Sequence, residues 1–307
     1  MLIGGNMEKI VGIVGLGKMG KNIALNLLNK GYSVFAYDRS KEPLDYVVKS
    51  GAIAVSGVSD FKNMIKQPRV IWLMLPAGEV TKEYATQLIN LLDRGDIIID
   101  GSNSFYKESR ELYELAASKG INYIDAGCSG GPSGALNGMS IMIGGDKKAF
   151  EHTESLFKDL SAPGGYKYIG PGGSGHFAKM VHNAIEYGMM EAIAEGLELV
   201  KEGPYRDIEI DELCHVWNNG SVIRGYLIEL AERTLKKDPE LSSVAPYVED
   251  TGEGRWAVQT AIEYNVPFTA ITHSLYERFS SRSEYRFGRR MLAALRHEFG
   301  GHEVKKA

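Results

Sequence analysis

The side chains best suited to chemistry lie in one segment, Gly175–Glu191, which reads GHFAKMVHNAIEYGMME. Five polar side chains recur there at positions i, i+3, i+4, i+7 and i+8, namely Lys179, His182, Asn183, Glu186 and Tyr187. That spacing places an amine, an imidazole, an amide, a carboxylate and a phenol on one face of a helix. The remaining residues are mostly apolar. We therefore expect a buried helix whose polar stripe lines a cavity.

Two other interpretations of this stripe are weaker. A solvated helix face could carry Lys179 and Glu186 by chance, but five hydrogen-bonding groups in an apolar segment make chance a poor explanation. A metal site would need a second His or Cys near His182 and Glu186, and the sequence offers none. The segment predicts a site without a metal.

A second candidate site is the glycine-rich turn GLGKMG near the N-terminus. Its three glycines have the G-x-G-x-x-G spacing, after a predicted strand and at the start of a predicted helix. Gly15 permits a tight turn, Gly17 lets the backbone approach a pyrophosphate, and Gly20 lets the helix pack against the strand. We prefer this interpretation to an ordinary glycine turn. It predicts a dinucleotide site formed by Gly15, Leu16, Gly17, Lys18, Met19 and Gly20.

Asp38 bears on the choice of dinucleotide. It ends the next predicted strand, 18 residues after Gly20, where a carboxylate can bind both ribose hydroxyls and repel a 2′-phosphate. We therefore predict NAD as the cofactor. Arg39 and Ser40 could hold a 2′-phosphate, so use of NADP stays open, and Asp38 could also simply cap a turn.

Two more loops follow predicted strands, where open sheets bind ligands. The first, Asp100–Ser104, contains Asn103, and the second runs from Ser129 to Gly134. Their amides and hydroxyls could bind an oxyanion or a polar substrate, although ordinary turn chemistry also explains either loop alone. We interpret the neighbouring Cys128 as a small buried residue rather than a nucleophile.

The elements that must position these groups alternate in the first half of the chain. Apolar runs predict strands, with helices between them, at Ile10–Val14, Ser33–Tyr37, Val70–Leu75, Asp96–Asp100, Asn122–Asp125, Ser140–Ile143 and Tyr166–Ile169. A helix is predicted over Met19–Asn29. This is the α/β pattern of a Rossmann-type, doubly wound sheet.

The predicted secondary structure changes at Gly170, from alternating strands and helices to helices alone. One long helix is predicted over Phe177–Val200, followed by helices at Ile210–Trp217, Val222–Lys236, Trp256–Tyr264, Phe268–Phe279 and Tyr285–His297. We therefore predict a Rossmann-like dinucleotide-binding domain over residues 1–170 and an all-helical domain over residues 171–307.

Composition excludes several classes of function. The chain has 307 residues, a net charge of -4 and 44% hydrophobic residues, which argues against general nucleic-acid affinity and against disorder. A local basic pocket stays open. Its longest apolar run, Val70–Leu75, is too short to cross a membrane. Cys128 and Cys214 predict free thiols and a cytoplasmic location. For residues 1–6, which precede Met7, a leader, an alternative start and a cloning remnant stay open.

Four motifs carry a family resemblance. GLGKMG, IIIDGSNS, CSGGPSGA and GHFAKMVHNAIEYG together resemble the decarboxylating 6-phosphogluconate dehydrogenases, from about Lys9 to His302, as a short form of the family. The VHN-x-IEYG part is highly specific, whereas the glycine motif is common to many dehydrogenases. The resemblance implies conversion of 6-phosphogluconate to ribulose 5-phosphate and carbon dioxide.

The resemblance also implies roles for individual residues. Lys179 would take the proton of the 3-hydroxyl, and Glu186 would protonate the enediol left after decarboxylation. A lysine base needs its pKa lowered from about 10.4 to near 7, which an apolar helix face could achieve. The sugar acid would be oriented by Asn103, which also lies at the cofactor site, and by Ser129, Gly130, Gly131, His182 and Asn183.

The same resemblance implies a phosphate site in the helical domain. Arg278 in YERFSSR, Arg255 in GEGRW and Tyr187 would contact the phosphate, although GEGRW departs from the common GTGKW. We interpret most of the other arginines of the segment Arg278–Arg296, which include Arg282, Arg286 and Arg289, as a solvated basic face. SGGPSG also departs from the longer members, where acidic residues are usual.

Near the C-terminus, Arg296 and His302 resemble an arginine and a histidine that a partner subunit donates. The resemblance therefore implies at least a homodimer with a tail acting in trans, and it leaves dimer and tetramer open. Two rival functions remain at this point. A non-decarboxylating 3-hydroxy acid dehydrogenase would use Lys179 without needing Glu186 or Arg278, and a non-catalytic nucleotide sensor would need only the glycine motif.

Overall fold

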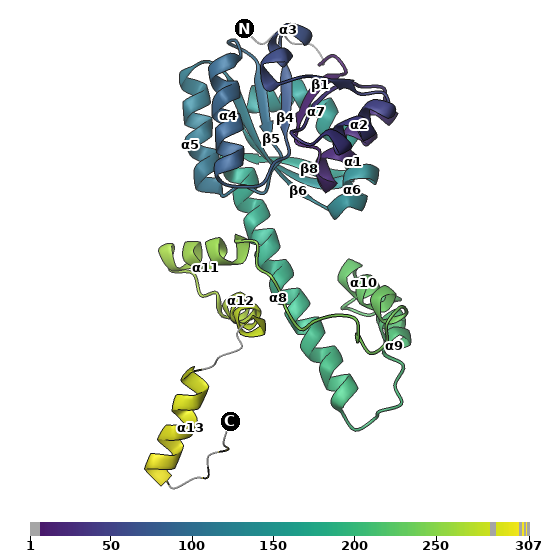
Figure 1. Ribbon diagram of the computed structural model, residues 1–307, viewed down its shortest axis with the longest axis vertical. Coiled ribbons are helices and arrows are strands. Elements are labelled where there is room, and N and C mark those ends of the chain that lie inside the picture. The colour runs from purple at the N-terminus through teal and green to yellow at the C-terminus, as the bar shows by residue number, and fades with distance from the viewer. Residues whose placement is uncertain (1–6, 283–286, 301–302, 304, 306–307) are drawn as a thin grey trace. The chain divides into compact units, whose positions relative to one another are not determined.

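The computed structural model describes residues 7–282, 287–300, 303 and 305, and it divides into two compact units, Met1–His182 and Asn183–Ala307. A β-sheet with helices on both faces forms the first unit, and helices form the second (Figure 1). The α/β fold class and the helical C-terminal region are therefore confirmed. The predicted domain boundary after residue 170 falls between the last strand and the long helix α8 (Ser174–Glu202).

Among the described residues, eight strands form one sheet in the order β3-β2-β1-β4-β5-β6-β7-β8. They are β1 (Ile10–Val14), β2 (Ser33–Tyr37), β3 (Ile53–Ala54), β4 (Val70–Leu73), β5 (Ile97–Asp100), β6 (Asn122–Ser129), β7 (Met139–Gly145) and β8 (Ser161–Gly170). The strands β1 to β6 pair in parallel, β7 is antiparallel to β6, and β8 is parallel to β7. The strand order reverses between β1 and β4, and such a switch point is where open α/β sheets bind ligands.

The helices of this unit are α1 (Lys18–Asn29), α2 (Lys41–Lys49), α3 (Phe61–Met64), α4 (Glu79–Leu91), α5 (Tyr106–Ser118), α6 (Gly131–Asn137) and α7 (Lys147–Leu160), with a 3-10 turn at Val58–Asp60. They bury both faces of the sheet. In β5, Ile97 and Ile99 belong to one apolar cluster and Ile98 belongs to the other. Alternate side chains of a strand point to opposite faces, so an unbroken apolar run is what a doubly covered strand requires.

Some strand ends differ from the predicted ones. The strand predicted over Val70–Leu75 ends at Leu73, because the Leu75 amide leaves the sheet and donates to Ser102 Oγ at 3.1 Å. The strand predicted over Asn122–Asp125 continues to Ser129, because antiparallel pairing with β7 extends it through residues without an apolar pattern. The strands Ile10–Val14 and Ser33–Tyr37 are confirmed.

The second unit contains the end of α8 and the helices α9 (Ile210–Asn218), α10 (Tyr226–Leu235), α11 (Glu253–Glu263), α12 (Thr269–Ser281) and α13 (Phe287–Gly300). A small core joins α9 and α10 through Cys214, Ile228 and Leu235, with Ile193 and Leu197 of α8 packed against it. Cys214 and Cys128 are free thiols. No helix among the described residues is long and apolar enough to cross a membrane.

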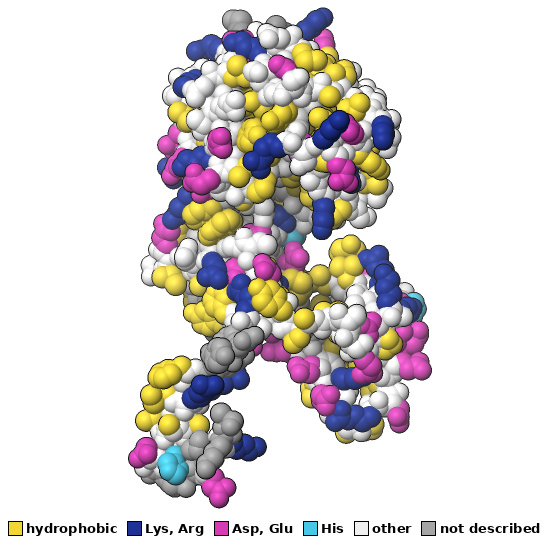
Figure 2. All heavy atoms as spheres, viewed as in Figure 1, with side chains coloured by type: hydrophobic (Ala, Val, Ile, Leu, Met, Phe, Trp, Pro, Cys, Tyr) yellow, Lys and Arg dark blue, Asp and Glu magenta, His cyan; other side chains and the backbone are white. Residues whose placement is uncertain are grey.

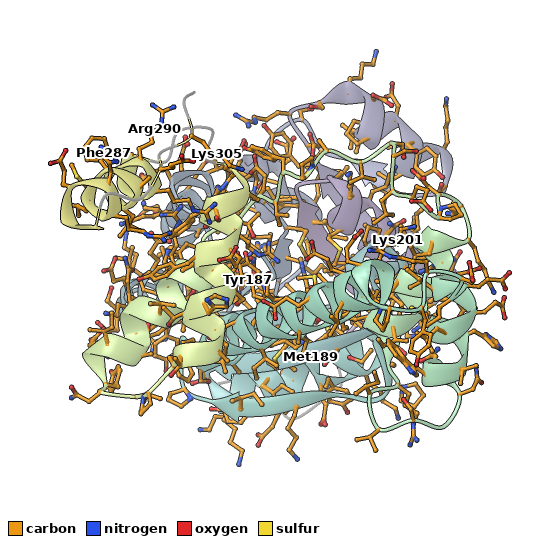
Figure 3. All side chains as sticks on the ribbon, turned by 90° about the horizontal axis from the view of Figure 1, so that it is seen from below. Tyr187, Met189, Lys201, Phe287, Arg290 and Lys305 are labelled. Carbon is orange, nitrogen blue, oxygen red and sulfur yellow. The ribbon has the colours of Figure 1, made fainter. Side chains whose placement is uncertain are left out.

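Two predictions about helices are wrong. The helix predicted from Val222 begins at Tyr226, because Ser221–Arg224 form a turn and the Asn218 side chain accepts a hydrogen bond from the Gly225 amide at 3.0 Å. Helix α8 is also not buried all round: Ile185 and Met189 are 50% and 51% exposed. The covered side carries Lys179 and Tyr187 together with the apolar Met180 and Ala184. Figure 3 shows Tyr187 and Met189 projecting from different sides of α8.

Candidate active site

The glycine turn lies at the switch point of the sheet and is shaped to admit a ligand. Gly15 has φ +92°, which favours glycine, and a Cβ added at Gly20 would overlap the Gly15 carbonyl oxygen. A Cβ added at Gly17 would meet nothing within 4 Å, so this side of the turn is open. Gly17 immediately precedes α1, whose N-terminal amides favour an anion. The turn therefore fits the pyrophosphate of a dinucleotide.

Asp38 supports this turn from the end of β2. Its Oδ2 accepts a hydrogen bond from the Leu16 amide at 2.6 Å, and its Oδ1 accepts one from the Ser40 amide at 2.7 Å. The carboxylate therefore caps a turn and also holds the glycine loop. Lys18, Arg39 and Ser40 are exposed, whereas Met19 packs partly against the core.

Helix α8 begins against the backbone of the sheet. Asp125 of β6 is buried and accepts hydrogen bonds from the Gly173 amide at 2.8 Å and the His176 amide at 2.9 Å. It thus satisfies amides at the start of α8 from a distant strand. A Cβ added at Gly127 would clash with the Cβ of Lys179, and one at Gly175 would clash with the Asp125 carbonyl oxygen. Small residues on β6 and α8 therefore set the position of Lys179.

Lys179 is 9% exposed, so most of its side chain is covered by protein. Burial raises the pKa of the neighbouring Cys128 thiol to about 12, and the charge of Lys179 lowers it by a smaller amount. The thiol therefore stays protonated near neutral pH, which agrees with the interpretation of Cys128 as a structural residue rather than a nucleophile.

The loop that carries Asn103 is fixed by a buried carboxylate. Asp100, at the end of β5, accepts hydrogen bonds from the Ser102 amide at 3.0 Å, Ser104 Oγ at 2.9 Å and Tyr123 Oη at 3.1 Å. These contacts hold the residues on both sides of Asn103, which is half-buried. The buried His176 lies behind them, with its Nδ1 2.7 Å from Ser109 Oγ.

The third loop of this unit meets α8 through one side-chain contact. Ser129 Oγ lies 3.2 Å from His182 Nε2, and both residues are half-buried. Gly130 and Gly131, which follow Ser129, are exposed and have φ values of +127° and +61°. The structure therefore brings this loop and the polar stripe of α8 together at His182.

In the second unit, Tyr187 of α8 is 7% exposed and lies under an arginine. The Arg278 guanidinium carbon is 3.6 Å from the centroid of the Tyr187 ring, and Arg278 Nη1 donates to the Glu249 carbonyl oxygen at 2.6 Å. A Cβ added at Gly254 would lie 2.7 Å from the Tyr187 ring, so the second glycine of GEGRW makes room for this contact. Arg278 and Tyr187 are thus brought together.

One turn before Tyr187, the polar stripe of α8 contacts the start of α11. Asn183 Nδ2 donates to Glu253 Oε1 at 3.1 Å, and Thr251 Oγ1 donates to Glu253 Oε2 at 2.5 Å. Glu253 is buried, while Glu186 is half-buried on α8. A carboxylate inside GEGRW that contacts Asn183 was not predicted from the sequence.

Arg255 and Arg282 share another carboxylate, Asp250. Arg255 Nε and Nη2 donate to Asp250 at 2.8 and 3.0 Å, and Arg282 Nη2 donates to it at 2.6 Å. Arg282 therefore pairs with a buried carboxylate and is not one of the arginines on a solvated basic face. Arg296 is exposed on α13, and Arg286 and His302 lie outside the described residues.

Sequence reasoning missed Asp125, Asp100, Asp250 and Glu253, all of which hold other predicted residues. The available signal was weak: Asp100 ends a strand, Asp125 ends a predicted strand, Glu253 stands between two glycines, and Asp250 stands in a segment without a recognisable pattern. No group of three or more His, Cys, Asp or Glu side chains among residues 7–282, 287–300, 303 and 305 is arranged to hold a metal ion.

Two family models match the chain. The NAD binding domain of 6-phosphogluconate dehydrogenase matches residues 10–170, and the C-terminal domain of 6-phosphogluconate dehydrogenase matches residues 175–306. Together they span nearly the whole chain, and the first one alone covers more than half of it.

Individual relatives agree with these matches. A Haloferax volcanii protein named NAD(+)-dependent, decarboxylating 6-phosphogluconate dehydrogenase is 39% identical, with 96% of this chain and 98% of the relative covered. A Bacillus subtilis protein named for the same family is 40% identical, with 96% and 99% covered. Plasmodium falciparum 6-phosphogluconate dehydrogenase, solved with NADP+ and with 6-phosphogluconate, superimposes with a TM-score of 0.82 at 30% identity. That match covers 97% of this chain and 66% of the longer Plasmodium chain.

Proposed function

We propose, because the chain belongs to the 6-phosphogluconate dehydrogenase family, that it oxidises 6-phospho-D-gluconate with NAD(P) and decarboxylates the product to D-ribulose 5-phosphate. The observation that carries this proposal is helix α8. It bears Lys179, which is nearly buried against β6, and two turns later Glu186 and Tyr187, with Arg278 stacked on the Tyr187 ring. A base, an acid and an anion-binding contact on one helix suit a phosphorylated hydroxy acid.

In this mechanism, bound NAD(P) supplies the acceptor for the hydride that leaves C3 of the substrate. Lys179 takes the proton of the C3 hydroxyl, which leaves a β-keto acid. The bond between the carboxylate carbon and C2 then breaks, carbon dioxide departs, and the bond electrons form a carbon–carbon double bond. Lys179 returns its proton to the former C3 oxygen, which completes an enediol, and it takes that proton back when the enediol becomes a ketone. Glu186 gives a proton to the carbon that becomes C1 of ribulose 5-phosphate. The sugar acid is oriented by Asn103, Ser129, Gly130, Gly131, His182 and Asn183.

The phosphate end of the substrate is assigned to Tyr187, Arg255 and Arg278. These side chains lie in the second unit, where two of the three are cations and Tyr187 is held by Arg278. Purified protein should therefore reduce cofactor with 6-phosphogluconate far faster than with unphosphorylated gluconate. Equal kcat/KM values for the two sugar acids would contradict this assignment.

For the cofactor, we propose a preference for NAD over NADP that depends on Asp38. Asp38→Asn should raise the ratio of kcat/KM for NADP to kcat/KM for NAD by about tenfold or more, because it removes a charge that repels the 2′-phosphate. Asparagine has one acceptor oxygen where Asp38 uses two, so one of the contacts to the Leu16 and Ser40 amides is also lost, which should weaken use of NAD.

The matched control for this substitution is Asp60→Asn. Asp60 also accepts a hydrogen bond from a backbone amide, that of Ser56 at 2.9 Å, but it lies outside the glycine turn. The control should leave the ratio unchanged. A wild-type enzyme that strongly prefers NADP would mean that Arg39 and Ser40 outweigh the carboxylate.

We also propose that the enzyme is a cytoplasmic homodimer whose tail completes the partner's site through Arg296 and His302. Exposed apolar side chains along α13 support docking, among them Phe287, Leu292 and Leu295 (Figure 2). Mixing inactive Arg296→Ala and Lys179→Met proteins should restore activity, since a mixed dimer regains one intact site. No recovery after confirmed subunit exchange would rule out a tail acting in trans.

A further inference from the structure

Asp250 is an unusual carboxylate, because it is almost fully buried at the centre of an arginine group. Only 2% of its side chain is exposed, and it pairs with Arg255 of α11 and with Arg282 at the end of α12. Hydrogen bonds from Arg255 lower the pKa of Asp250, burial opposes them, and Arg282 adds to the lowering. The carboxylate is therefore ionised near neutral pH.

The group is also held from the other side by an aromatic ring. The guanidinium carbons of Arg255 and Arg282 lie 4.4 and 5.5 Å from the centroid of the Phe279 ring. One carboxylate therefore meets two guanidinium groups, which leaves a net positive charge at this point. Arg282 Nε also donates to the Arg278 backbone carbonyl oxygen at 3.2 Å, one turn earlier in α12, which fixes the Arg282 side chain further.

The geometry of the Arg255 pair leaves an arginine that can still meet a ligand. Asp250 engages Nε and Nη2, which form one edge of the guanidinium plane. The guanidinium group of an arginine has further N–H donors besides those that Asp250 engages, and the Arg255 side chain is 50% exposed. Asp250 itself is too deeply buried to be a ligand contact.

We propose that Asp250 is a positioning residue, which holds Arg255 and Arg282 as one anion-binding surface for the phosphate group of the substrate. This inference rests on the proposed function. It assigns Arg282 to the phosphate site together with Arg255 and Arg278. Mobile arginine side chains lose conformational entropy when a phosphate binds them, and this loss weakens binding. Arginines that Asp250 already fixes have lost that entropy before the phosphate arrives, so they bind it more tightly.

If Asp250 competed with the phosphate instead of positioning the arginines, its removal would change the affinity for the substrate in the opposite direction. If Asp250 merely competed with phosphate for the two arginines, removing its charge would tighten binding of the substrate. If Asp250 positions them, removing the charge loosens binding, even though the site becomes more positive. The sign of the change in affinity therefore separates the two roles.

The test compares Asp250→Asn with Glu232→Gln, a matched control in the same unit. Glu232 also accepts contacts from two side chains, Lys236 and His215, but it lies outside the arginine group. Asp250→Asn should raise KM for 6-phosphogluconate about tenfold to a hundredfold, because charge-assisted arginine contacts to phosphate are weakened. It should change kcat and KM for NAD little, and Asp250→Glu should restore part of the loss.

A second readout is binding of inorganic phosphate, measured as the rise in melting temperature that phosphate produces. Wild-type protein should show the rise, and Asp250→Asn should lose most of it. If Asp250→Asn does not fold, Arg282→Lys decides the matter: it keeps the charge without the planar fork and should raise KM for 6-phosphogluconate severalfold.

The outcomes keep this inference apart from the proposed function. The positioning role is overturned if Asp250→Asn leaves KM for 6-phosphogluconate unchanged or lowers it. If Asp250→Asn does not fold, an unchanged KM in Arg282→Lys overturns the role instead. In either case the proposed function stands as long as the wild-type protein turns over 6-phosphogluconate. Phosphate binding that depends on Asp250, in a wild-type protein that does not turn over 6-phosphogluconate, supports the anion site and overturns the proposed function.

Discussion

Lys179→Met should abolish most of the cofactor reduction that 6-phosphogluconate supports. We expect kcat to fall by about 10²–10⁴-fold, the contribution typical of a positioned general base. The side chain is nearly buried, and the contacts of Asp125 and Gly127 fix the part of α8 that carries it. Methionine has a similar length and fills the same space without a charge, so we expect the fold to survive.

The control for this variant lies on the same helix. Lys201 is in the last turn of α8, pairs with Glu240 and is partly exposed, and Figure 3 shows it on the same helix as Tyr187 and Met189. Lys201→Met removes the same charge and should keep wild-type kcat. Thermal unfolding of both variants should resemble that of wild type. A Lys179→Met protein with wild-type activity would remove Lys179 from the chemistry.

Glu186→Gln should have the second largest effect, and at a later step. Hydride transfer needs Lys179 but not Glu186, so a single turnover should still reduce cofactor at a rate close to that of wild type. Protonation of the enediol should slow by about 10²–10⁴-fold, because the amide cannot supply the proton. Steady-state turnover should fall with it.

Incorporation of solvent tritium into ribulose 5-phosphate measures this step directly. The control is Glu195→Gln, an exposed carboxylate on the same helix, which should incorporate tritium at the wild-type rate. Wild-type tritium incorporation by Glu186→Gln, or loss of the first hydride transfer, would assign Glu186 another role.

Local sequence patterns were sufficient for most of the fold. The apolar runs at Ile10–Val14 and Ser33–Tyr37 match β1 and β2, because strands buried on both faces need unbroken apolar side chains. The glycine spacing of the first turn was equally informative. Gly15 has a positive φ, Gly17 faces open space and Gly20 touches the turn, as the three roles require.

Long-range contacts could not be predicted in this way. Asp125 holds the start of α8 from 48 and 51 residues away, and Asp250 pairs with Arg282 across 32 residues. No spacing or periodic pattern in the sequence links Asp125 to α8 or Asp250 to Arg282. The exposed apolar side of α8 at Ile185 and Met189 was missed for a related reason, because composition indicates burial but not which element of the fold provides it.

The central claim is that one protein both oxidises and decarboxylates 6-phosphogluconate. The most direct test incubates the purified wild-type protein with 6-phosphogluconate labelled in its carboxyl carbon and with NAD, and counts reduced cofactor and labelled carbon dioxide in the same sample. We predict one carbon dioxide for each cofactor reduced, with both products absent from Lys179→Met. Cofactor reduction without release of carbon dioxide would indicate a non-decarboxylating hydroxy acid dehydrogenase, and neither product would indicate a protein that binds nucleotide without turnover.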